Sequence, residues 1–556
     1  MRNARLYIYI SFLLIVSACK KGADDPASIT PATPSFSFQS LKVNGGYNGF
    51  TYYNINYNPV IKFSFSTKIN QQSVSNAISF RDKSGTVIPF TSSLENNDST
   101  VVLQPSSNLS AITKYVVSLS TNLKSQQNGS LLSGTTVNLT TQIDSTDKFP
   151  VITDDALLTL VQQQTFKYFW NFAHPVSGLA RERNTSGETV TTGGSGFGIM
   201  AIPVAINRSF ITRAQGLTRM QTIVGFLKNT AQRFHGAFPH WLNGTTGAVI
   251  PFSQKDNGAD LVETSYLMQG LICARQYFDG TDAAETTLRN DINIIYNGVE
   301  WSWFRQGTQN VLYWHWSPNY NWEMNFPIHG WNECLITYVM AASSTTFPVP
   351  KIVYDNGWAQ NGAIINNNTY YGLQLPLGPA YGGPLFFSHY SFLGINPNQL
   401  VDAYANYQTQ TRNHTLINYN YCVANPLNNF GYSNSCWGLT ASDIENDYTA
   451  SSPTNDRGFI APTAALSSFP YTPTESMKAL KFFYYKLGDK IWGNYGFVDA
   501  FSLKDTWFAN STLAIDQGPI IVMIENYRTG LLWNLFTGAP EVKAGMQSLG
   551  FTAPYL

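Results

Sequence analysis

The sequence contains little charge and no excess of either sign. Charged residues make up 12% of its 556 residues, and 34 Lys and Arg are balanced by 34 Asp and Glu. A chain without net positive charge has no electrostatic reason to bind nucleic acid or an anionic membrane surface. The composition therefore predicts no nucleic-acid partner.

Cysteine is also scarce, with five in the whole chain. Cys273 and Cys334 lie in apolar runs of helical period, where we expect buried thiols. Cys422 and Cys436 flank a loop rich in Gly and Asn, and in an oxidising compartment they could form a disulfide. No CxxC pair or His/Cys cluster has the spacing of a zinc site, so we expect no metal.

The chain has no long apolar run beyond its N-terminus. Arg2 and Arg5 precede an apolar stretch that ends in "LLIVSAC", which is the order of a targeting segment. It resembles a bacterial lipoprotein signal, which implies that Cys19 becomes the lipidated first residue of the mature chain. Residues 1–19 would then be the signal and residues 20–35 a flexible tether. We expect a periplasmic or cell-surface protein that contacts the membrane through its lipid anchor alone.

Residues 36–145 alternate apolar and polar side chains with a period of two. Examples are "IKFSFS" from Ile61 and "YVVSLS" from Tyr115, separated by turns rich in Asn, Ser and Gly. The pattern predicts a small all-β sandwich and resembles the immunoglobulin-like (Ig-like) modules of bacterial surface proteins. The segment contains no group of acids or histidines. We expect a spacer, with glycan binding as the alternative.

From residue 150 to residue 556 the period changes to that of helices. Runs of this period lie at residues 153–173, 196–207, 212–234, 260–278, 283–304, 328–343, 399–413 and 474–487. About a dozen helices joined by uneven loops predict an all-α domain and suit an (α/α) barrel around one cleft. The glycine run "GGSGFG" has no preceding strand and no following Lys-Ser/Thr pair, so we expect no nucleotide cofactor.

Aromatic residues, in contrast, are abundant at 14%. Their rings stack on the apolar faces of sugars, although a large core would also account for them. Several junctions between loops and helices combine aromatics with acids, Arg or His. We predict substrate-binding roles for the following residues: Glu182, Arg183, His315, Trp316, Trp331, Glu333, His389, Tyr390 and Trp437.

Glu263 lies on the apolar face of a predicted helix that Asp260 is placed to cap. Apolar surroundings raise the pKa of a carboxyl and keep it protonated for donation to a leaving oxygen. A second acid must stay ionised to activate water, and polar Asp443 suits that role. The alternatives are structural. Glu263 could pair with Arg181 or Arg183, and Asp443 could cap a helix or close a turn.

Seven motifs occur in order between residue 153 and the C-terminus: "GSGFGIMAI", "GADLVETSYLMQGL", "GWNECLITYVMAASS", "WGLTASD", "APTAALSSFPYTPTESM", "GFVDAF" and "AIDQGPIIVMIENYRTGLLW". Together they resemble the glucoamylase-like domain of bacterial lipoproteins, and in particular the β-1,2-glucanases of glycoside hydrolase family 144. The resemblance implies an (α/α)6 barrel that hydrolyses β-1,2-glucan with inversion and without a metal. It places the general acid at Glu263 and the base at Asp443 or Asp456.

Two other functions stay open from the sequence. A polysaccharide lyase can also be an α/α toroid, but it needs an acidic sugar and usually a basic groove, which the neutral charge does not favour. A non-catalytic glycan-binding lipoprotein would keep the Trp residues without a matched pair of acids. We expect a monomer whose partner is an oligo- or polysaccharide.

Overall fold

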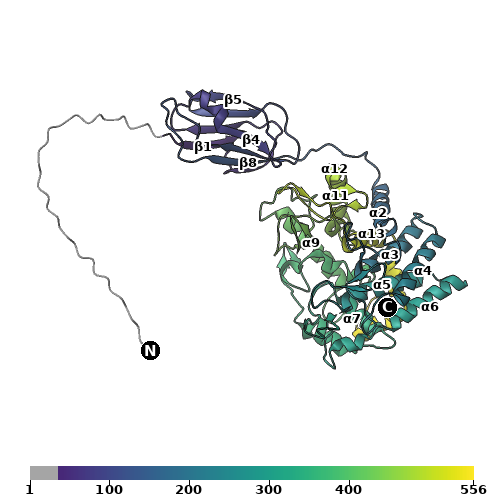
Figure 1. Ribbon diagram of the computed structural model, residues 1–556. Helices are drawn as coiled ribbons and strands as arrows, with labels where there is room; N and C mark the ends of the chain where they lie inside the picture. Colours follow the sequence, from purple (N-terminus) through teal and green to yellow (C-terminus); the bar gives the residue numbers. More distant parts are fainter. Residues whose placement is uncertain (1–35) are drawn as a thin grey trace, which may run out of the picture.

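The computed structural model describes residues 36–556. The predicted signal, the lipidation at Cys19 and the tether lie outside these residues. The described chain forms a β-sandwich followed by a larger helical domain (Figure 1). This confirms the predicted fold class, a small Ig-like sandwich before an all-α barrel.

Two four-stranded sheets make the sandwich, in the orders β1-β3-β6-β5 and β2-β8-β7-β4. Neighbouring strands are antiparallel except for β2 and β8, which run parallel. Ile61, Phe63 and Phe65 of one strand all face the core, as the period of two requires. The strands are β1 (Phe38–Val43), β2 (Thr51–Ile55), β3 (Ile61–Phe65), β4 (Ile78–Asp82), β5 (Phe90–Glu95), β6 (Thr100–Pro105), β7 (Lys114–Leu119) and β8 (Thr135–Thr141).

The helical domain has an inner and an outer layer. Helices α3 (Thr192–Asn207), α5 (Leu261–Tyr277), α7 (Leu335–Ser343), α10 (Pro462–Leu466) and α13 (Ala514–Thr529) are buried over most of their length, as inner helices are. Among them, α3 packs against α5 and α13, and α5 packs against α7. The 3-10 turn Ser391–Leu393 contacts both α7 and α13 and helps to close the ring. This is the (α/α)6 arrangement.

The outer helices bury one face and expose the other. They are α2 (Asp154–Trp170), α4 (Arg213–Asn229), α6 (Ala283–Asn297), α9 (Tyr407–Ala424), α11 (Pro473–Lys481) and α15 (Pro540–Leu549). Short strands in the connecting segments pair in twos and threes. Among them are β9 (Thr189–Thr191), β10 (Trp241–Asn243), β12 (Ala259–Asp260), β13 (His315–Trp316), β16 (Ala441–Ile444), β17 (Asp447–Ala450), β20 (Phe501–Ser502) and β21 (Trp507–Phe508). No helix among residues 36–556 combines the length and apolar character that crossing a membrane requires.

Three predicted helices differ most from the observed ones. The run at 328–343 is helical only from Leu335 onward. The run at 399–413 is a helix only from Tyr407 onward, because the Asn406 side chain accepts the Thr409 N–H and starts α9 there. The run at 283–304 ends as α6 at Asn297, where Gly298 caps it.

All four cysteines among the described residues are buried and free, so Cys422 and Cys436 do not form the disulfide that the sequence allowed.

The glycine run at the start of α3 has a packing role. A Cβ added at Gly196 would lie 2.3 Å from the Tyr266 carbonyl oxygen of α5, and one added at Gly270 would lie 2.2 Å from the Gly196 carbonyl oxygen. Neither position has room for a side chain. The glycines therefore let the backbones of α3 and α5 touch, which explains a glycine-rich run without any phosphate.

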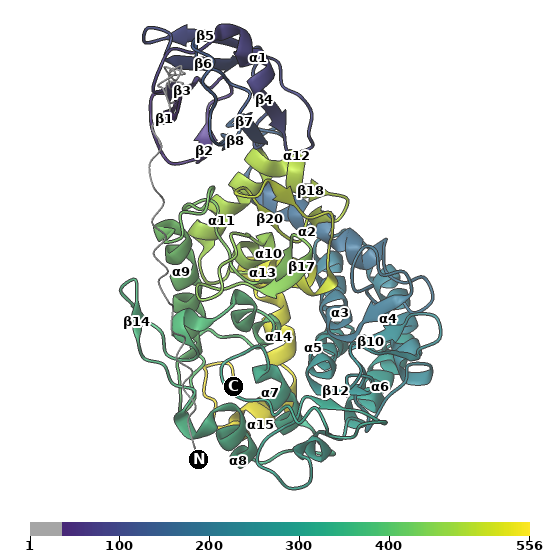
Figure 2. The same ribbon diagram turned by 60° about the vertical axis from the view of Figure 1, so that its left-hand side comes forward.

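The sandwich contacts the helical domain at a few points (Figure 2). The ring of Tyr53 stacks on that of Phe430, with centroids 5.7 Å apart. The Lys83 ammonium donates to the Asp505 carbonyl oxygen at 3.0 Å and lies 3.6 Å from the Glu445 carboxylate. Glu445 belongs to the turn between β16 and β17, so the sandwich contacts the tip of this hairpin.

Candidate active site

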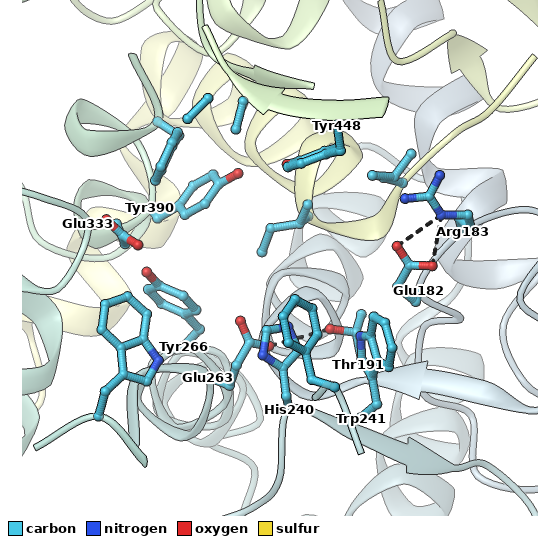
Figure 3. Close-up of a pocket in the computed structure, with 17 residues that line it drawn as sticks. Glu182, Arg183, Thr191, His240, Trp241, Glu263, Tyr266, Glu333, Tyr390 and Tyr448 are labelled. Carbon is cyan, nitrogen blue, oxygen red and sulfur yellow. Dashed lines mark hydrogen bonds and ion pairs between the residues drawn. The ribbon is translucent and has the colours of Figure 1, made fainter. Parts of the chain in front are cut away.

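A cavity of about 510 Å³ lies where the N-termini of several inner helices meet (Figure 3). Thr191 precedes α3, Glu263 is in the first turn of α5, Glu333 comes just before α7, and Leu513 precedes α13. Helix N-termini carry partial positive charge and unpaired N–H groups, so acids are favoured there. Most of the remaining lining is aromatic: Trp241, Phe252, Tyr266, Trp314, Phe386, Tyr390 and Tyr448.

Glu263 points into this cavity from α5. Its N–H and that of Val262 donate to Asp260 Oδ1, so Asp260 caps the helix as the sequence predicts. Its carboxylate Oε2 accepts the Gly193 N–H at 2.6 Å and lies 3.4 Å from the Thr191 hydroxyl. Burial raises the pKa of Glu263 to about 6, although the charge of a neighbouring histidine partly opposes this.

Gly193 is required for that hydrogen bond. A Cβ at this position would lie 2.7 Å from Glu263 Oε2 and 2.8 Å from the ring of Tyr266. Any side chain would push the carboxylate away from the N-terminus of α3. The position of the acid is therefore set by main-chain atoms of a neighbouring helix.

A second buried acid, Glu333, lies on the same side of the cavity. Burial raises the pKa of Glu333 to about 7, and the negative charges of Glu263 and Asp260 add to this. Tyr390 and Tyr266 lie beside it in the lining (Figure 3). The buried Tyr266 hydroxyl has no hydrogen-bond partner among the described residues, so it is available to a ligand.

The opposite wall carries charge. Arg183 Nε donates to both carboxylate oxygens of Glu182, at 3.1 and 3.0 Å, and Arg183 Nη1 lies 3.2 Å from Asp443 Oδ2. The Ser511 hydroxyl donates to the same Asp443 oxygen at 2.5 Å. Asp443 lies on β16, and its hairpin partner β17 brings Tyr448 into the cavity lining.

Two buried carboxyls lie behind Asp443. Asp499 Oδ2 accepts the Asp443 backbone N–H at 2.6 Å. Burial and the charge of Asp443 raise the pKa of Asp499 to about 7. Burial and the charge of Asp499 raise the pKa of Asp516 well above its usual range. Raised pKa values favour a proton between the two carboxyls, and Asp499 holds the β16 backbone at Asp443.

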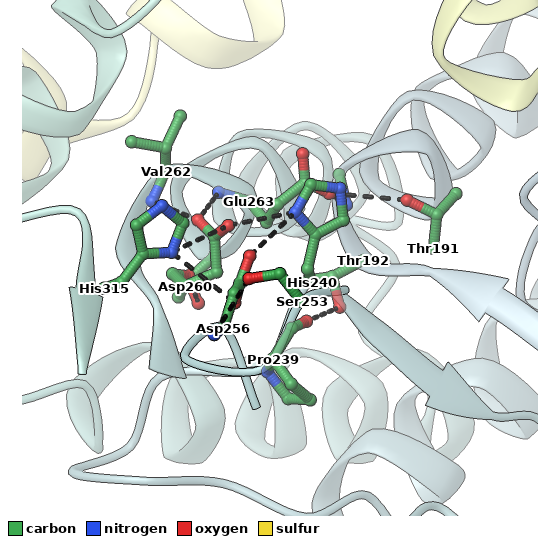
Figure 4. A network of polar contacts seen from close by, with 12 residues as sticks. Thr191, Thr192, Pro239, His240, Ser253, Asp256, Asp260, Val262, Glu263 and His315 are labelled. Atoms are coloured by element: carbon green, nitrogen blue, oxygen red, sulfur yellow. Dashed lines mark hydrogen bonds and ion pairs between the residues drawn. The ribbon is translucent and has the colours of Figure 1, made fainter. Parts of the chain in front are cut away.

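A network of two histidines and two aspartates lies under Glu263 (Figure 4). His240 Nδ1 lies 3.2 Å from Asp260 Oδ2 and 3.7 Å from Asp256 Oδ2. His315 Nδ1 lies 3.5 Å from Asp256 Oδ1 and 3.7 Å from Asp260 Oδ2. Asp256, Asp260 and His240 have the ligand types that bind a cation. Protons on the two imidazoles already balance the two carboxylates, and we interpret the group as an ion-pair network.

Comparison with known proteins agrees with this geometry. A family model described as "Putative glucoamylase" matches residues 325–540, and a bacterial Ig-like domain model matches residues 49–141. An endo-β-1,2-glucanase from Chitinophaga pinensis, solved with sophorotriose and glucose, is 52% identical, with a TM-score of 0.71 over 73% of this chain and 100% of that one. The chain belongs to the glucoamylase-like family of glycoside hydrolases.

Two further relatives of this family come from Parabacteroides distasonis. A β-1,2-glucanase structure is 38% identical, with a TM-score of 0.70 over 93% of this chain and 73% of that one. An exo β-1,2-glucooligosaccharide sophorohydrolase acting at the non-reducing end is 46% identical over 431 residues. That match covers 73% of this chain and 59% of the relative, so the chain spans less than two thirds of the sophorohydrolase.

The structure brings several of the predicted site residues of this glycoside hydrolase together. Glu263, Glu333, Glu182, Arg183 and Tyr390 all line the cavity, and Asp443 lies directly behind its charged wall. The structural alternative for Glu263 does not apply, because Arg181 donates to backbone carbonyls and Arg183 pairs with Glu182 and Asp443. The alternative for Asp443 does not apply either, since its carboxylate binds Arg183 and Ser511 and caps no helix.

Two predicted site residues lie near the cavity without lining it. His315 supports Asp256 and Asp260 from behind, and 9% of its side chain is exposed. Trp316 follows it on β13 and packs its ring against Trp303 and His235. Both therefore act on the lining through other residues.

Four other predicted site residues do not line this cavity, and their side chains are engaged in packing or in hydrogen bonds elsewhere. Trp331 is in the main core, and Trp437 is fully buried in a second core with its indole N–H donated to the Glu475 carbonyl. His389 bonds to Ser468, and burial lowers its pKa to about 3. The Asp456 carboxylate accepts from Tyr421, Asn429, Tyr432 and the Gly458 N–H, away from the cavity lining.

The sequence analysis missed His240, Trp241 and Tyr448. His240 occurs in "FPHW", a short loop without a period, so nothing local marks it. Tyr448 directly follows Asp447 in "ENDYTASS", a stretch rich in acids and without a period. For Tyr448, the available signal was an aromatic residue directly after an acid in a loop.

Proposed function

We propose that this chain hydrolyses β-1,2-linked glucan by an inverting acid/base mechanism. The observation that carries the proposal is a buried acid with a raised pKa, Glu263, at one wall of an aromatic cavity, with Asp443 paired to Arg183 behind the opposite wall. The named activities of the C. pinensis and P. distasonis relatives support β-1,2-glucan as the substrate.

Glu263 would act as the general acid. Hydrolysis of a glycosidic bond needs a proton on the leaving oxygen, and a carboxyl with a pKa of about 6 still carries one in mildly acidic solution. When the proton leaves, the Gly193 N–H at 2.6 Å and the N-terminus of α3 stabilise the new carboxylate. The surroundings of Glu263 therefore stabilise the carboxylate that forms when it gives up its proton.

Asp443 would act as the general base, either directly or through a substrate hydroxyl. Arg183 and Ser511 fix its carboxylate, and Asp499 fixes its backbone N–H. An inverting reaction needs a water on the face of the sugar opposite the acid, and walls that carry the two acids separately leave room for it. Asp456 is not proposed, because its carboxylate is consumed by four hydrogen bonds elsewhere.

The aromatic lining would bind the glucose units. Trp241, Trp314, Tyr390 and Tyr448 present rings to the cavity, and pyranose faces stack on such rings. Apolar walls also exclude water from the acid, which keeps its pKa raised. The lining would therefore bind the sugar and tune the donor together.

We also propose a location and a state for the protein. The lipoprotein-like N-terminus supports a lipid anchor at Cys19 and a periplasmic or surface position, with the membrane contacted through the anchor alone. A monomer is proposed, with the sandwich as a spacer between the anchor and the catalytic domain. Metabolic labelling with a fatty-acid analogue, absent from a Cys19→Ala variant, tests the anchor.

Incubation with a panel of β-1,2-, β-1,3-, β-1,4- and α-linked glucans, followed by chromatography of the products, tests the activity. We expect products from β-1,2-glucan alone, and no reaction with the matched variant Glu263→Gln. Release of sophorose only would identify exo action, and a ladder of oligosaccharides would identify endo action. Cleavage of another linkage with β-1,2-glucan untouched would contradict the proposal.

A further inference from the structure

Two aromatic rings and two carboxylates hold the imidazole of His240 in place. Phe252 stacks on its imidazole at 4.2 Å between centroids, and the Trp241 ring stands edge-on to it at 5.7 Å. Its Nδ1 faces two carboxylates, Asp260 at 3.2 Å and Asp256 at 3.7 Å. The ring has one orientation that satisfies all of these contacts, and it places the imidazole beside Glu263 at the cavity (Figures 3 and 4).

The two carboxylates that hold His240, Asp260 and Asp256, are themselves fixed by burial and by other contacts. Asp260 Oδ1 is fully used as the cap of α5, so its Oδ2 is left for the histidines. Asp256 is buried, and its Oδ1 has no hydrogen-bond partner other than the longer approach to His315. Two buried carboxylates without positive charge would be costly, which requires that the imidazoles carry protons.

Among residues 36–556, His240 is the positively charged group beside Glu263. Asp260 on its own helix, Asp256 on the preceding loop and Glu333 before α7 are acids that oppose its ionisation. Tyr266 and Cys334 are neutral, and the α3 side contributes only Thr191 and the Gly193 N–H. The ionised form of Glu263 therefore depends on the imidazolium for Coulombic stabilisation.

We propose that His240 is a positioning residue of this active site, and that its positive charge, held beside Glu263 by Asp260 and Asp256, stabilises the carboxylate that forms when Glu263 gives its proton to the substrate. The inference rests on the proposed function, because it takes Glu263 as the donor. His315 has a supporting role, since it binds the same two carboxylates from the other side.

The charges explain why His240 stays protonated. Burial alone would lower the pKa of His240, but the charges of Glu263 and Asp260, together with that of Asp256, outweigh it and raise the pKa to about 9. The imidazolium therefore persists over the whole range in which Glu263 exchanges its proton. Its charge favours the ionised form of Glu263, so its removal raises the pKa of that carboxyl.

The test is the pH profile of kcat for His240→Gln on a β-1,2-gluco-oligosaccharide. Without the positive charge Glu263 keeps its proton to higher pH, so the alkaline limb should move up by about one pH unit. A donor that holds its proton more tightly gives it up less readily, so the plateau of kcat should fall about tenfold. KM should change little. His240→Lys, which restores a positive charge, should return the limb toward that of the wild type.

His235→Gln is the matched control. His235 Nδ1 lies 2.9 Å from the Glu300 carboxylate and its ring stacks on Trp303 at 3.5 Å, so it repeats the chemistry of His240 away from the cavity lining. Its variant should leave the alkaline limb in place. An unmoved limb in folded His240→Gln, or an equal shift in His235→Gln, would overturn the inference.

A measurement without turnover separates this inference from the proposed function. Titration of the His240 imidazole by NMR of histidine-labelled protein should give a pKa near 9 in the wild type and a lower value in Glu263→Gln. A wild-type value below neutrality would overturn the inference even if Glu263 is the acid. Full activity of Glu263→Gln with a high His240 pKa would instead refute the proposed donor.

Discussion

The two walls of the cavity fix their acids by opposite means. On the α3–α5 side, Glu263 and Glu333 lie among aromatic rings, and burial raises their pKa values to about 6 and about 7. On the hairpin side, Asp443 pairs with Arg183 and accepts from the Ser511 hydroxyl. One wall keeps a proton available, and the other keeps a negative charge in place.

This difference separates the roles of chemically similar groups. All of these residues are carboxylic acids of ordinary intrinsic acidity, and in the proposed mechanism their surroundings suit one to donate a proton and another to accept one. The α3–α5 wall is made of helix N-termini and rings, whereas the hairpin wall is made of loops and strands that bring an Arg and a Ser to one oxygen. Substitutions that exchange or remove these surroundings test the comparison.

The largest effect is expected from Glu263→Gln. Gln keeps the shape and the hydrogen bond from Gly193 but cannot give a proton, so kcat should fall by about 10²–10⁴-fold with little change in KM. Steady-state kinetics on β-1,2-gluco-oligosaccharides measures this, with circular dichroism to show that the fold is intact. If Glu333→Gln is inactive while Glu263→Gln is active, the donor is the other acid of this wall.

A loss at the lower end of about 10²–10⁴-fold is expected from Asp443→Asn on the opposite wall. The fall is smaller because Arg183 and Ser511 remain to orient water. Asp456→Asn is the matched control, since it breaks hydrogen bonds of the Tyr421–Tyr432 segment and should cost about 1–3 kcal/mol of stability with kcat retained. A normal kcat for Asp443→Asn would place the base elsewhere.

Asp516→Asn should stabilise the protein at alkaline pH. Burial raises the pKa values of Asp516 and of its neighbour Asp499, the latter to about 7. The folded chain therefore binds these protons more tightly than the unfolded chain, so the stability they contribute is complete below the ordinary carboxyl pKa and is lost as the pH rises through the folded value. Tm of the variant minus that of the wild type should be larger at pH about 8 than at pH about 5. A constant difference would contradict a shared proton behind Asp443.

The smallest effect is expected from Lys83→Ala, which cuts the contact between the sandwich and the tip of the Asp443 hairpin. Lys83 and Glu445 are 3.6 Å apart and both 45% exposed, and exposed pairs of this kind stabilise little. We expect kcat/KM to change less than about threefold. Lys62→Ala, which removes an ion pair within the sandwich, is the control. A large loss for Lys83→Ala alone would show that the sandwich organises the charged wall.

The sequence predicted the α3–α5 wall better than the hairpin wall. Glu263 belongs to a long helix whose period shows which face is buried, and Asp260 marks where the helix begins. The fold class followed from the same periods. Asp443 lies on a four-residue strand. The sequence marked it as a candidate acid, but so short a strand has no period that shows which way its side chain points.

The errors have a common physical cause. A Trp in a loop can face a cavity or a core, and Trp331 and Trp437 face the core because segments distant in sequence cover them. His240 was missed because Asp260 and Asp256 follow it by 20 and 16 residues and His315 comes far later, so no local pattern joins them. Such contacts exist only after the chain has folded.

The contact between α3 and α5 also bears on how the family can diversify. Gly193, Gly196 and Gly270 leave the position of Glu263 to main-chain atoms, whereas most of the rings that line the cavity come from separate loops and strands. Exchange of those rings would change the shape of the cavity while Glu263 keeps its position. The glycines thus fix Glu263 through the helical scaffold, and mutational libraries that seek new substrates belong on the aromatic lining.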